Sequence, residues 1–97
     1  MTIQAVLEVT AKTDKAEEFR EWLVRILPDT RGYKGNVSVE FVRNQDDPAD
    51  VVILEKWDTR ADYEAYLAWR TETGILDELG EFIEGELKVR YFDPMGV

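Results

Sequence analysis

Hydrophobic residues recur along this chain at two spacings, which predict strands in some segments and helices in others. Every second residue is apolar from Ile3 to Val9, so residues 2–11 are expected to form a strand with one fully apolar face. An apolar run at residues 51–57 and alternating patterns at residues 37–42 and 86–92 predict three more strands. A polar turn cluster at residues 44–50 joins the strand at residues 37–42 to the strand at residues 51–57, as in a hairpin.

Apolar residues three or four positions apart predict the helices. The first helix is expected to open on a capping box of Asp14 and Glu17, and Pro28 is expected to end or kink it near its last turn. A second helix follows Thr59, which pairs with Asp62 as a weaker capping signal, and it breaks at residues 73–74. Residues 75–83 predict a short amphipathic helix that is closed at Gly85.

The predicted order is β-α-β-β-α-(α)-β. Right-handed crossovers and a hairpin fold this order into an α+β, ferredoxin-like βαββαβ domain over residues 1–97, with helices on one face of a four-stranded antiparallel sheet. The other face still carries apolar side chains among charges, at Val6, Val42, Val52 and Leu54. A sheet face of this kind in so small a protein predicts a homodimer through the open face.

Composition narrows the possible functions. The formal charge of −9, from 21 acidic and 12 basic residues, argues against binding to nucleic acid or to an anionic membrane. The chain has no cysteine and no histidine, which excludes thiol chemistry and removes the commonest ligand for zinc and haem iron. The sequence enters a strand pattern at once, without a signal-peptide pattern, so a cytoplasmic location is expected.

Aromatic residues gather where the third strand meets the second helix. Trp57, Tyr63, Tyr66 and Trp69 lie within thirteen positions, and they are four of the eleven aromatic side chains in the chain. This strand-to-helix joint is where we expect the wall of any binding site.

Three segments carry a resemblance to a known family. They are LEKW at residues 54–57, DTRADYEAYLAWRTETG at residues 58–74 and VRYFDP at residues 89–94. In this order and spacing the chain resembles the antibiotic biosynthesis monooxygenase (ABM) family of dimeric α+β-barrel proteins. The resemblance implies an enzyme that oxidises a small phenolic, quinol or polyketide-like aromatic with O₂ and uses no cofactor, neither flavin nor metal.

The resemblance also places Trp57 in the pocket, and Tyr66 stands where relatives commonly carry a histidine. We expect Trp57 to be a stacking wall and Tyr66 a hydrogen-bond donor to an oxyanion. Glu55 shares the strand face of Trp57, and burial would raise its pKa enough for it to act as the base. Arg70 is a candidate anchor for an anion, although a cation at a helix C-terminus also compensates the helix dipole. Further substrate-binding candidates are Trp22, Tyr33, Asn36, Tyr63 and Trp69.

A simpler interpretation exists for each of these residues, because buried aromatics are commonly core and a strand glutamate commonly pairs with a lysine or arginine. The alternative function is therefore a non-catalytic small-molecule-binding or dimeric interaction protein on the same scaffold. Ala5 and Val6 stand where some relatives carry an assisting asparagine, which favours this alternative. The retained Trp57 and the aromatic helix favour the enzyme. Some relatives degrade haem, and the absence of histidine predicts no haem binding here.

Overall fold

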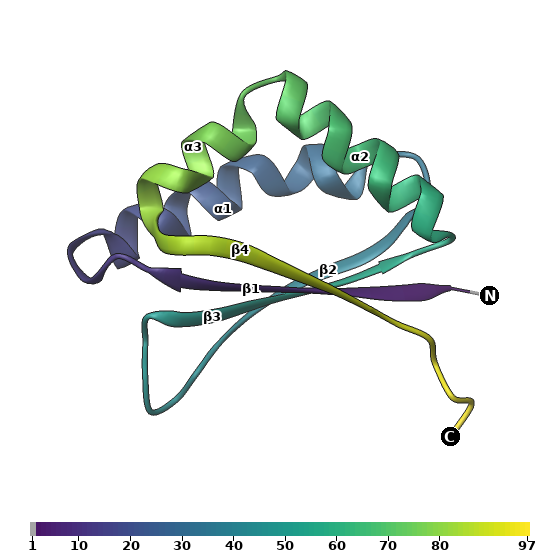
Figure 1. Ribbon diagram of the computed structural model, residues 1–97, viewed down its shortest axis with the longest axis horizontal. Helices are drawn as coiled ribbons and strands as arrows, with labels where there is room; N and C mark the ends of the chain where they lie inside the picture. The colour runs from purple at the N-terminus through teal and green to yellow at the C-terminus, as the bar shows by residue number, and fades with distance from the viewer. Residues whose placement is uncertain (1) are drawn as a thin grey trace.

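A computed structural model describes residues 2–97 and contains one antiparallel sheet with strand order β2-β3-β1-β4. All helices cover the same face of this sheet (Figure 1). This arrangement confirms the predicted α+β, ferredoxin-like fold. In chain order the elements are β1 (Ile3–Ala11), a 3-10 turn η1 (Thr13–Lys15), α1 (Ala16–Arg31), β2 (Asn36–Arg43), β3 (Asp50–Trp57), α2 (Arg60–Glu72), α3 (Ile75–Phe82) and β4 (Ile83–Phe92).

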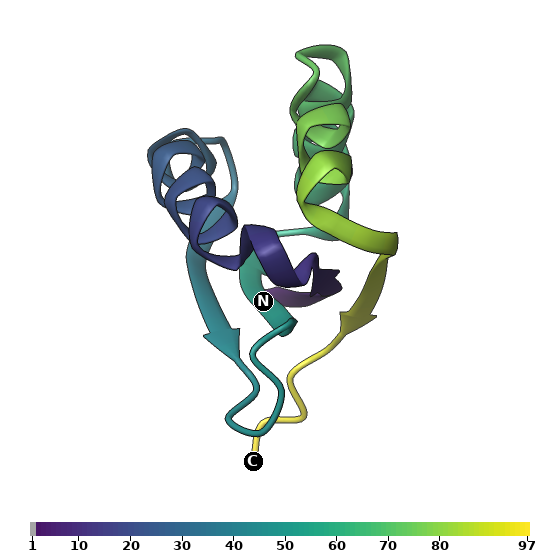
Figure 2. The same ribbon diagram turned by 90° about the vertical axis from the view of Figure 1, so that its left-hand side faces the viewer.

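The helices form two groups above the sheet. Figure 2 shows α1 over the β2 side, and α2 with α3 over the β4 side. The side chains between these groups and the sheet form the core, which includes Leu7, Val9, Leu23, Ile53 and Leu79, each at most 8% exposed. Alternation along β1 and β3 places these residues on the helix side, as their spacing predicts.

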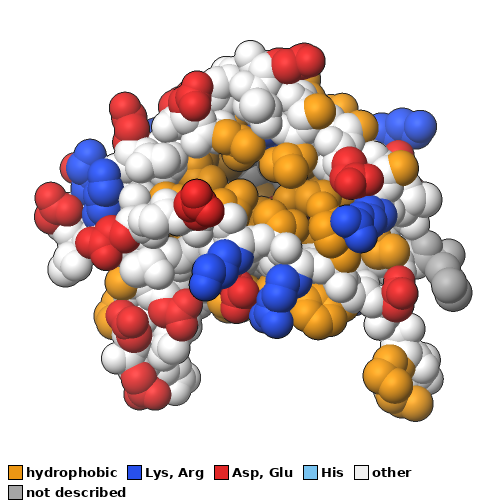
Figure 3. Space-filling view, in the orientation of Figure 1, with side chains coloured by type: hydrophobic (Ala, Val, Ile, Leu, Met, Phe, Trp, Pro, Cys, Tyr) orange, Lys and Arg blue, Asp and Glu red, His pale blue; other side chains and the backbone are white. Residues whose placement is uncertain are grey.

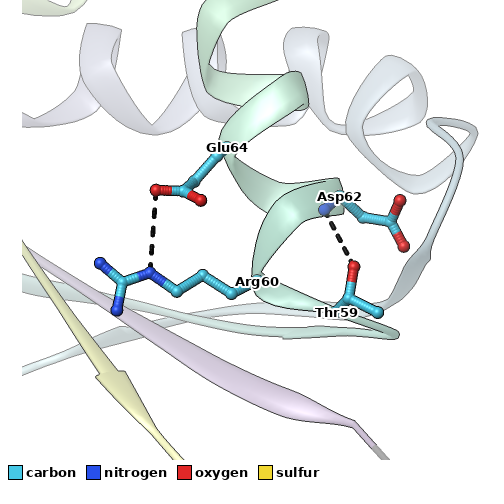
Figure 4. Close-up of polar contacts among 4 residues, drawn as sticks. All are labelled: Thr59, Arg60, Asp62 and Glu64. Atoms are coloured by element: carbon cyan, nitrogen blue, oxygen red, sulfur yellow. Dashed lines mark hydrogen bonds and ion pairs between the residues drawn. The ribbon is translucent and has the colours of Figure 1, made fainter.

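The two capping predictions had different outcomes. Thr59 caps α2, since its Oγ1 accepts a hydrogen bond of 3.1 Å from the backbone N–H of Asp62 (Figure 4). The capping box of Asp14 and Glu17 does not form, so that prediction is wrong. The chain first makes the 3-10 turn, and α1 then begins after Lys15, which makes no side-chain cap bond.

Two predicted helix ends also differ from those in the structure. Pro28 does not end α1, because the structure places it inside this helix, which continues to Arg31. The last helix ends at Phe82 and not at Gly85, because Ile83 already pairs with Ala11 in the sheet. Gly85 has φ +69° and lies where the register of β4 shifts against β1, a conformation that suits glycine.

The sheet face away from the helices has the predicted apolar residues. Val6 faces Leu54 across β1 and β3, and Val42 faces Val52 across β2 and β3. Val42 is 40% exposed and the other three are half-buried. Among residues 2–97 no helix is long and apolar enough to cross a membrane.

Candidate functional site

A cavity of about 60 Å³ lies between the sheet and the helices and contains three polar side chains, Glu55, Tyr66 and Arg70. The face seen in Figure 3 is hollowed between the helices and β4, with hydrophobic side chains around the recess. The cavity is otherwise apolar. Its walls are Leu7, Phe41, Ile53 and Leu87 of the sheet, Trp22, Leu23 and Ile26 of α1, and Leu67, Ile75, Leu76 and Leu79 of α2 and α3.

Glu55 is a buried carboxyl group in this cavity. It lies on β3 two residues before Trp57, so both side chains point to the helix side of the sheet, and it is 4% exposed. Burial raises the pKa of Glu55 from 4.5 to about 7, while the hydrogen bond from Trp57 and the charge of Arg70 lower it. Among residues 2–97 Glu55 makes no salt bridge. It can therefore accept or release a proton near neutral pH.

Trp57 supports Glu55 and does not line the cavity. Its side chain is 0% exposed, and its indole Nε1 donates a hydrogen bond of 2.9 Å to Oε1 of Glu55. Its ring packs against those of Tyr63 and Tyr66, with centroids 5.7 and 5.0 Å away. Trp57 therefore fixes the position of the Glu55 carboxyl group from a site outside the cavity lining.

Arg70 is the cation of the cavity, and its hydrogen bonds connect α2 to α1. Its Nε donates to the Tyr66 hydroxyl at 2.9 Å, and its Nη2 donates to the Ile26 carbonyl at 2.8 Å and to Thr30 Oγ1 at 3.0 Å. Tyr66 and Thr30 share a further hydrogen bond of 2.6 Å between their hydroxyl oxygens. Among residues 2–97 no bond is made by Arg70 Nη1, although the side chain is only 3% exposed.

The charges in the cavity favour an anion. Arg70 has no carboxylate within salt-bridge distance among residues 2–97, and the nearby Glu55 loses its own charge as the pH falls through about 7. Burial raises the pKa of Tyr66, so this phenol stays protonated at neutral pH, although its bonds to Thr30 and Arg70 oppose the shift. A buried cation without an anionic partner is costly, and a negatively charged ligand oxygen would supply the missing partner.

The remaining candidates lie at the cavity or behind it. Trp22 lines the cavity, and its Nε1 donates to Glu78 of α3 at 3.0 Å. Tyr33 stacks on Trp69 with centroids 5.2 Å apart, and neither residue lines the cavity. Two candidates carry buried polar atoms that have no hydrogen-bond partner among residues 2–97. They are Asn36, whose backbone faces that of Trp57 across β2 and β3, and Tyr63, whose ring packs on Trp57.

The structure therefore separates the predicted residues into two groups. Glu55, Tyr66, Arg70 and Trp22 meet at the cavity. The other four aromatic candidates form a layer behind it, and Asn36 lies beside Trp57 in the sheet. Thr30 was missed by the sequence analysis. Its signal was available, because Thr30 continues the helical stripe of Phe19, Leu23 and Ile26 with a polar residue at an inward-facing position.

Comparison with known proteins identifies the relatives of this chain. The family model of antibiotic biosynthesis monooxygenase matches residues 2–71. Two structures with 24% sequence identity are candidate antibiotic biosynthesis monooxygenases. One is from Nitrosomonas europaea, with TM-score 0.80 over 97% of this chain and 90% of that chain. The other is from Deinococcus radiodurans, with TM-score 0.81 over 97% and 92%.

A conserved protein from Methanosarcina mazei Go1 has TM-score 0.85 at 17% identity over 95% of this chain and 91% of that chain. At these identities the structures show a shared fold. No curated protein is detectably similar in sequence.

Proposed function

The chain belongs to the antibiotic biosynthesis monooxygenase family, and we propose that it is a cofactor-independent monooxygenase acting in the cavity between sheet and helices. The proposed substrate is a small phenolic, quinol or polyketide-like aromatic, and the oxidant is O₂. One observation carries the proposal: a carboxyl group with a pKa of about 7 lines the same apolar cavity as a guanidinium that has no salt-bridge partner among residues 2–97.

These two groups suit the first step of such an oxidation. O₂ is a triplet and reacts slowly with neutral organic molecules, so the substrate must become a strong electron donor, as a phenolate or enolate. Glu55 would take the proton, and Arg70 would donate from Nη1 to the oxyanion that forms. The apolar walls would exclude water and strengthen both interactions.

The step balances without an added reductant. For a substrate with an activated CH₂ group, Glu55 takes one proton and the carbanion electrons reduce O₂ as a C–O bond forms, which yields a hydroperoxide. Loss of the second C–H proton then breaks the O–O bond, and the products are a ketone and water. The substrate supplies all of the electrons, and one oxygen atom of O₂ remains in the product.

The other buried residues act on these two groups. Trp57 would orient Glu55, because its indole N–H is bonded to the carboxyl oxygen. Tyr66 was predicted from sequence as a direct donor to the oxyanion. Its hydroxyl bonds to Thr30 and Arg70, so in this proposal it also fixes the position of Arg70.

The cavity must widen to hold an aromatic ring. An apolar cavity of ~150 Å³ binds benzene, and this one is about 60 Å³. The wall that we expect to move is α3, which supplies Ile75, Leu76 and Leu79 and follows Gly74, a residue at φ +83°.

We also propose a homodimer through the open sheet face. Val6, Val42, Val52 and Leu54 lie on this face beside charged residues. A second copy would remove these apolar side chains from water.

Labelled oxygen tests the proposed reaction. Metal-stripped protein would be incubated under ¹⁸O₂ with a panel of anthrones and quinols, and the products analysed by mass spectrometry. We expect one labelled oxygen in an anthrone product, at a rate above the autoxidation blank. A new product oxygen that carries no label, and therefore comes from water, would contradict the mechanism.

A binding protein without turnover is the second candidate. It is favoured by the hydrogen bonds among Arg70, Tyr66 and Thr30, which already exist without a ligand. Quenching of tryptophan fluorescence by panel compounds, together with no oxygen uptake, would favour this candidate.

A further inference from the structure

A second hollow lies outside the site, between α1 and the turn end of β2 and β3. Its volume is about 250 Å³, and its apolar lining includes Phe19, Leu23 and Phe41. Val24 also lines it and is 53% exposed. We call this hollow the α1–β2 groove. It leaves apolar surface in water, which a partner would cover.

Two arginines give the groove a positive charge. Arg20 of α1 and Arg43 of β2 both line it and are exposed. Among residues 2–97 the only ion pairs are Arg60–Glu64 and Arg90–Glu8, so neither groove arginine has an acidic partner. In a chain with net charge −9, an apolar groove flanked by two unpaired cations suits a segment that is both apolar and acidic.

The segment after β4 has this chemistry. Residues 93–97 belong to no helix or strand and are exposed, and they contain one acid, Asp93. Met95 is 88% exposed and Val97 is fully exposed, so both leave their side chains in water. We call residues 93–97 the C-terminal segment.

The C-terminal segment cannot reach the groove of its own chain. Phe92 pairs with Gln4 at one end of β1, whereas the groove lies beside Ala11 at the other end. Those seven positions along β1 span about 23 Å at ~3.3 Å per residue, and five extended residues span at most about 17 Å. Figure 1 shows the C-terminus and the turn between β2 and β3 at opposite ends of the molecule, both on the side of the sheet away from the helices.

We propose that the C-terminal segment of one copy docks in the α1–β2 groove of a second copy, and that the segment of the second copy docks in the groove of the first. In this dimer the open sheet faces would pair about a two-fold axis with the strands of the two sheets running in opposite directions. Each segment would then lie at the end of its partner that carries the turn between β2 and β3, which borders the groove at Pro48. Met95 and Val97 would fill the apolar part, and Asp93 would pair with Arg20 or Arg43. The proposal rests on the proposed homodimer and not on the proposed oxygenation.

The shape of the groove suits an extended segment. The groove is about 250 Å³ and open at the surface, so a segment can lie along it and place two or three side chains in it.

Engineered cysteines test the contact directly, because the chain has no cysteine of its own. A Val24→Cys protein would be mixed with a tagged Met95→Cys protein and oxidised. The control replaces Val24→Cys by Val37→Cys, because Val37 is the same residue type, is 51% exposed and does not line the groove. At ~10 μM protein, an effective concentration in the mM range makes the Val24 pair form roughly 100-fold faster than the Val37 pair.

A charge exchange gives a second readout. Arg43→Glu in the Val24→Cys protein should slow cross-linking several-fold, and Asp93→Arg in the Met95→Cys protein should restore the rate. Equal cross-linking rates at Val24 and Val37 would overturn the proposal, as would a wild-type protein that stays monomeric at every concentration. Both readouts are independent of oxygen uptake, so failure of the oxygenase proposal would leave this one standing.

Discussion

The indole N–H of Trp57 donates a hydrogen bond of 2.9 Å to the carboxyl oxygen of Glu55, two residues earlier on the same strand. Both side chains are buried on the helix side of the sheet. The bond stabilises the ionised form of Glu55 and opposes the effect of burial, so the pKa settles at about 7. Trp57 thereby keeps a buried carboxyl group usable as a base near neutral pH.

Replacing Trp57 should therefore change the pH dependence of the reaction. Trp57→Phe keeps an aromatic ring and removes the N–H donor, so the pKa of Glu55 should rise above about 7. The midpoint of the pH–rate profile for oxygen uptake should move to higher pH by the same amount. Trp69→Phe is the matched control, because Trp69 makes no bond to Glu55. A midpoint that stays in place in Trp57→Phe would contradict the positioning role.

Glu55 should also make stability depend on pH. Its pKa is raised in the folded protein, so the folded state binds the proton more tightly than the unfolded state between pH 4.5 and about 7. Stability therefore falls as the pH rises through this window, by about 3 kcal/mol at about 1.4 kcal/mol per pKa unit. The full cost is present above pH 7, and none of it remains below pH 4.5.

Urea unfolding of Glu55→Gln and wild type across this pH range measures the effect. The free energy of unfolding of the variant should gain about 3 kcal/mol relative to wild type between pH 4 and pH 8. The exposed Glu84→Gln is the control and should show no such trend. A constant difference between Glu55→Gln and wild type would mean that Glu55 titrates normally.

These features were predictable from sequence to different degrees. The i, i+2 spacing of Glu55 and Trp57 was enough to place both on one strand face. The bonds from Arg70 to Ile26 and Thr30 could not be foreseen, because they join residues 44 and 40 positions apart and depend on how α1 and α2 pack. The start of β4 at Ile83 was missed for a similar reason. Ile83 fits the apolar pattern of either a helix or a strand, and only pairing with Ala11 decides between them.

The charge of Arg70 should cost stability. Replacing a buried ion pair or triad by apolar side chains of similar volume is often neutral or stabilising by ~1–4 kcal/mol, and Arg70 carries the desolvation cost of a buried ion without an ion pair among residues 2–97. Thr30 and Tyr66 remain bonded to each other without Arg70. We therefore expect Arg70→Met to melt at the same or a higher temperature than wild type and to lose at least tenfold in affinity for a phenolate-forming ligand. A variant that fails to fold would show that the guanidinium is structural.

Replacement of Leu79 by alanine tests the packing of α3 against the core. Leu79 is 7% exposed and lines the cavity, so Leu79→Ala should lower the free energy of unfolding by about 2–5 kcal/mol. Val24→Ala, at a position that is 53% exposed, should cost far less. Near-wild-type stability of Leu79→Ala would count against the packing of α3 on the core.

A substitution at Gly35 tests the packing between the loop before β2 and the start of α2. Gly35 has φ +88°, and a Cβ at this position would lie within 2.6 Å of the Asp62 side chain. Gly74 has φ +83°, and no atom of residues 2–97 lies within 4 Å of its Cβ position, so it is the matched control for backbone strain alone. Gly74→Ala should cost about 1–2 kcal/mol, and Gly35→Ala should cost more. Equal losses in thermal unfolding would mean that Asp62 simply moves aside.

Oxygen uptake by wild type and Glu55→Gln tests the central claim, that Glu55 is the base of a cofactor-independent oxygenation. Metal-stripped proteins would be compared against a panel of anthrones and quinols, with autoxidation blanks and Glu84→Gln as the control. We expect wild type and Glu84→Gln to exceed the blank equally. Glu55→Gln should fall by about 10²–10⁴-fold, the usual contribution of general base catalysis. Equal uptake by Glu55→Gln and wild type would contradict the assignment of the base.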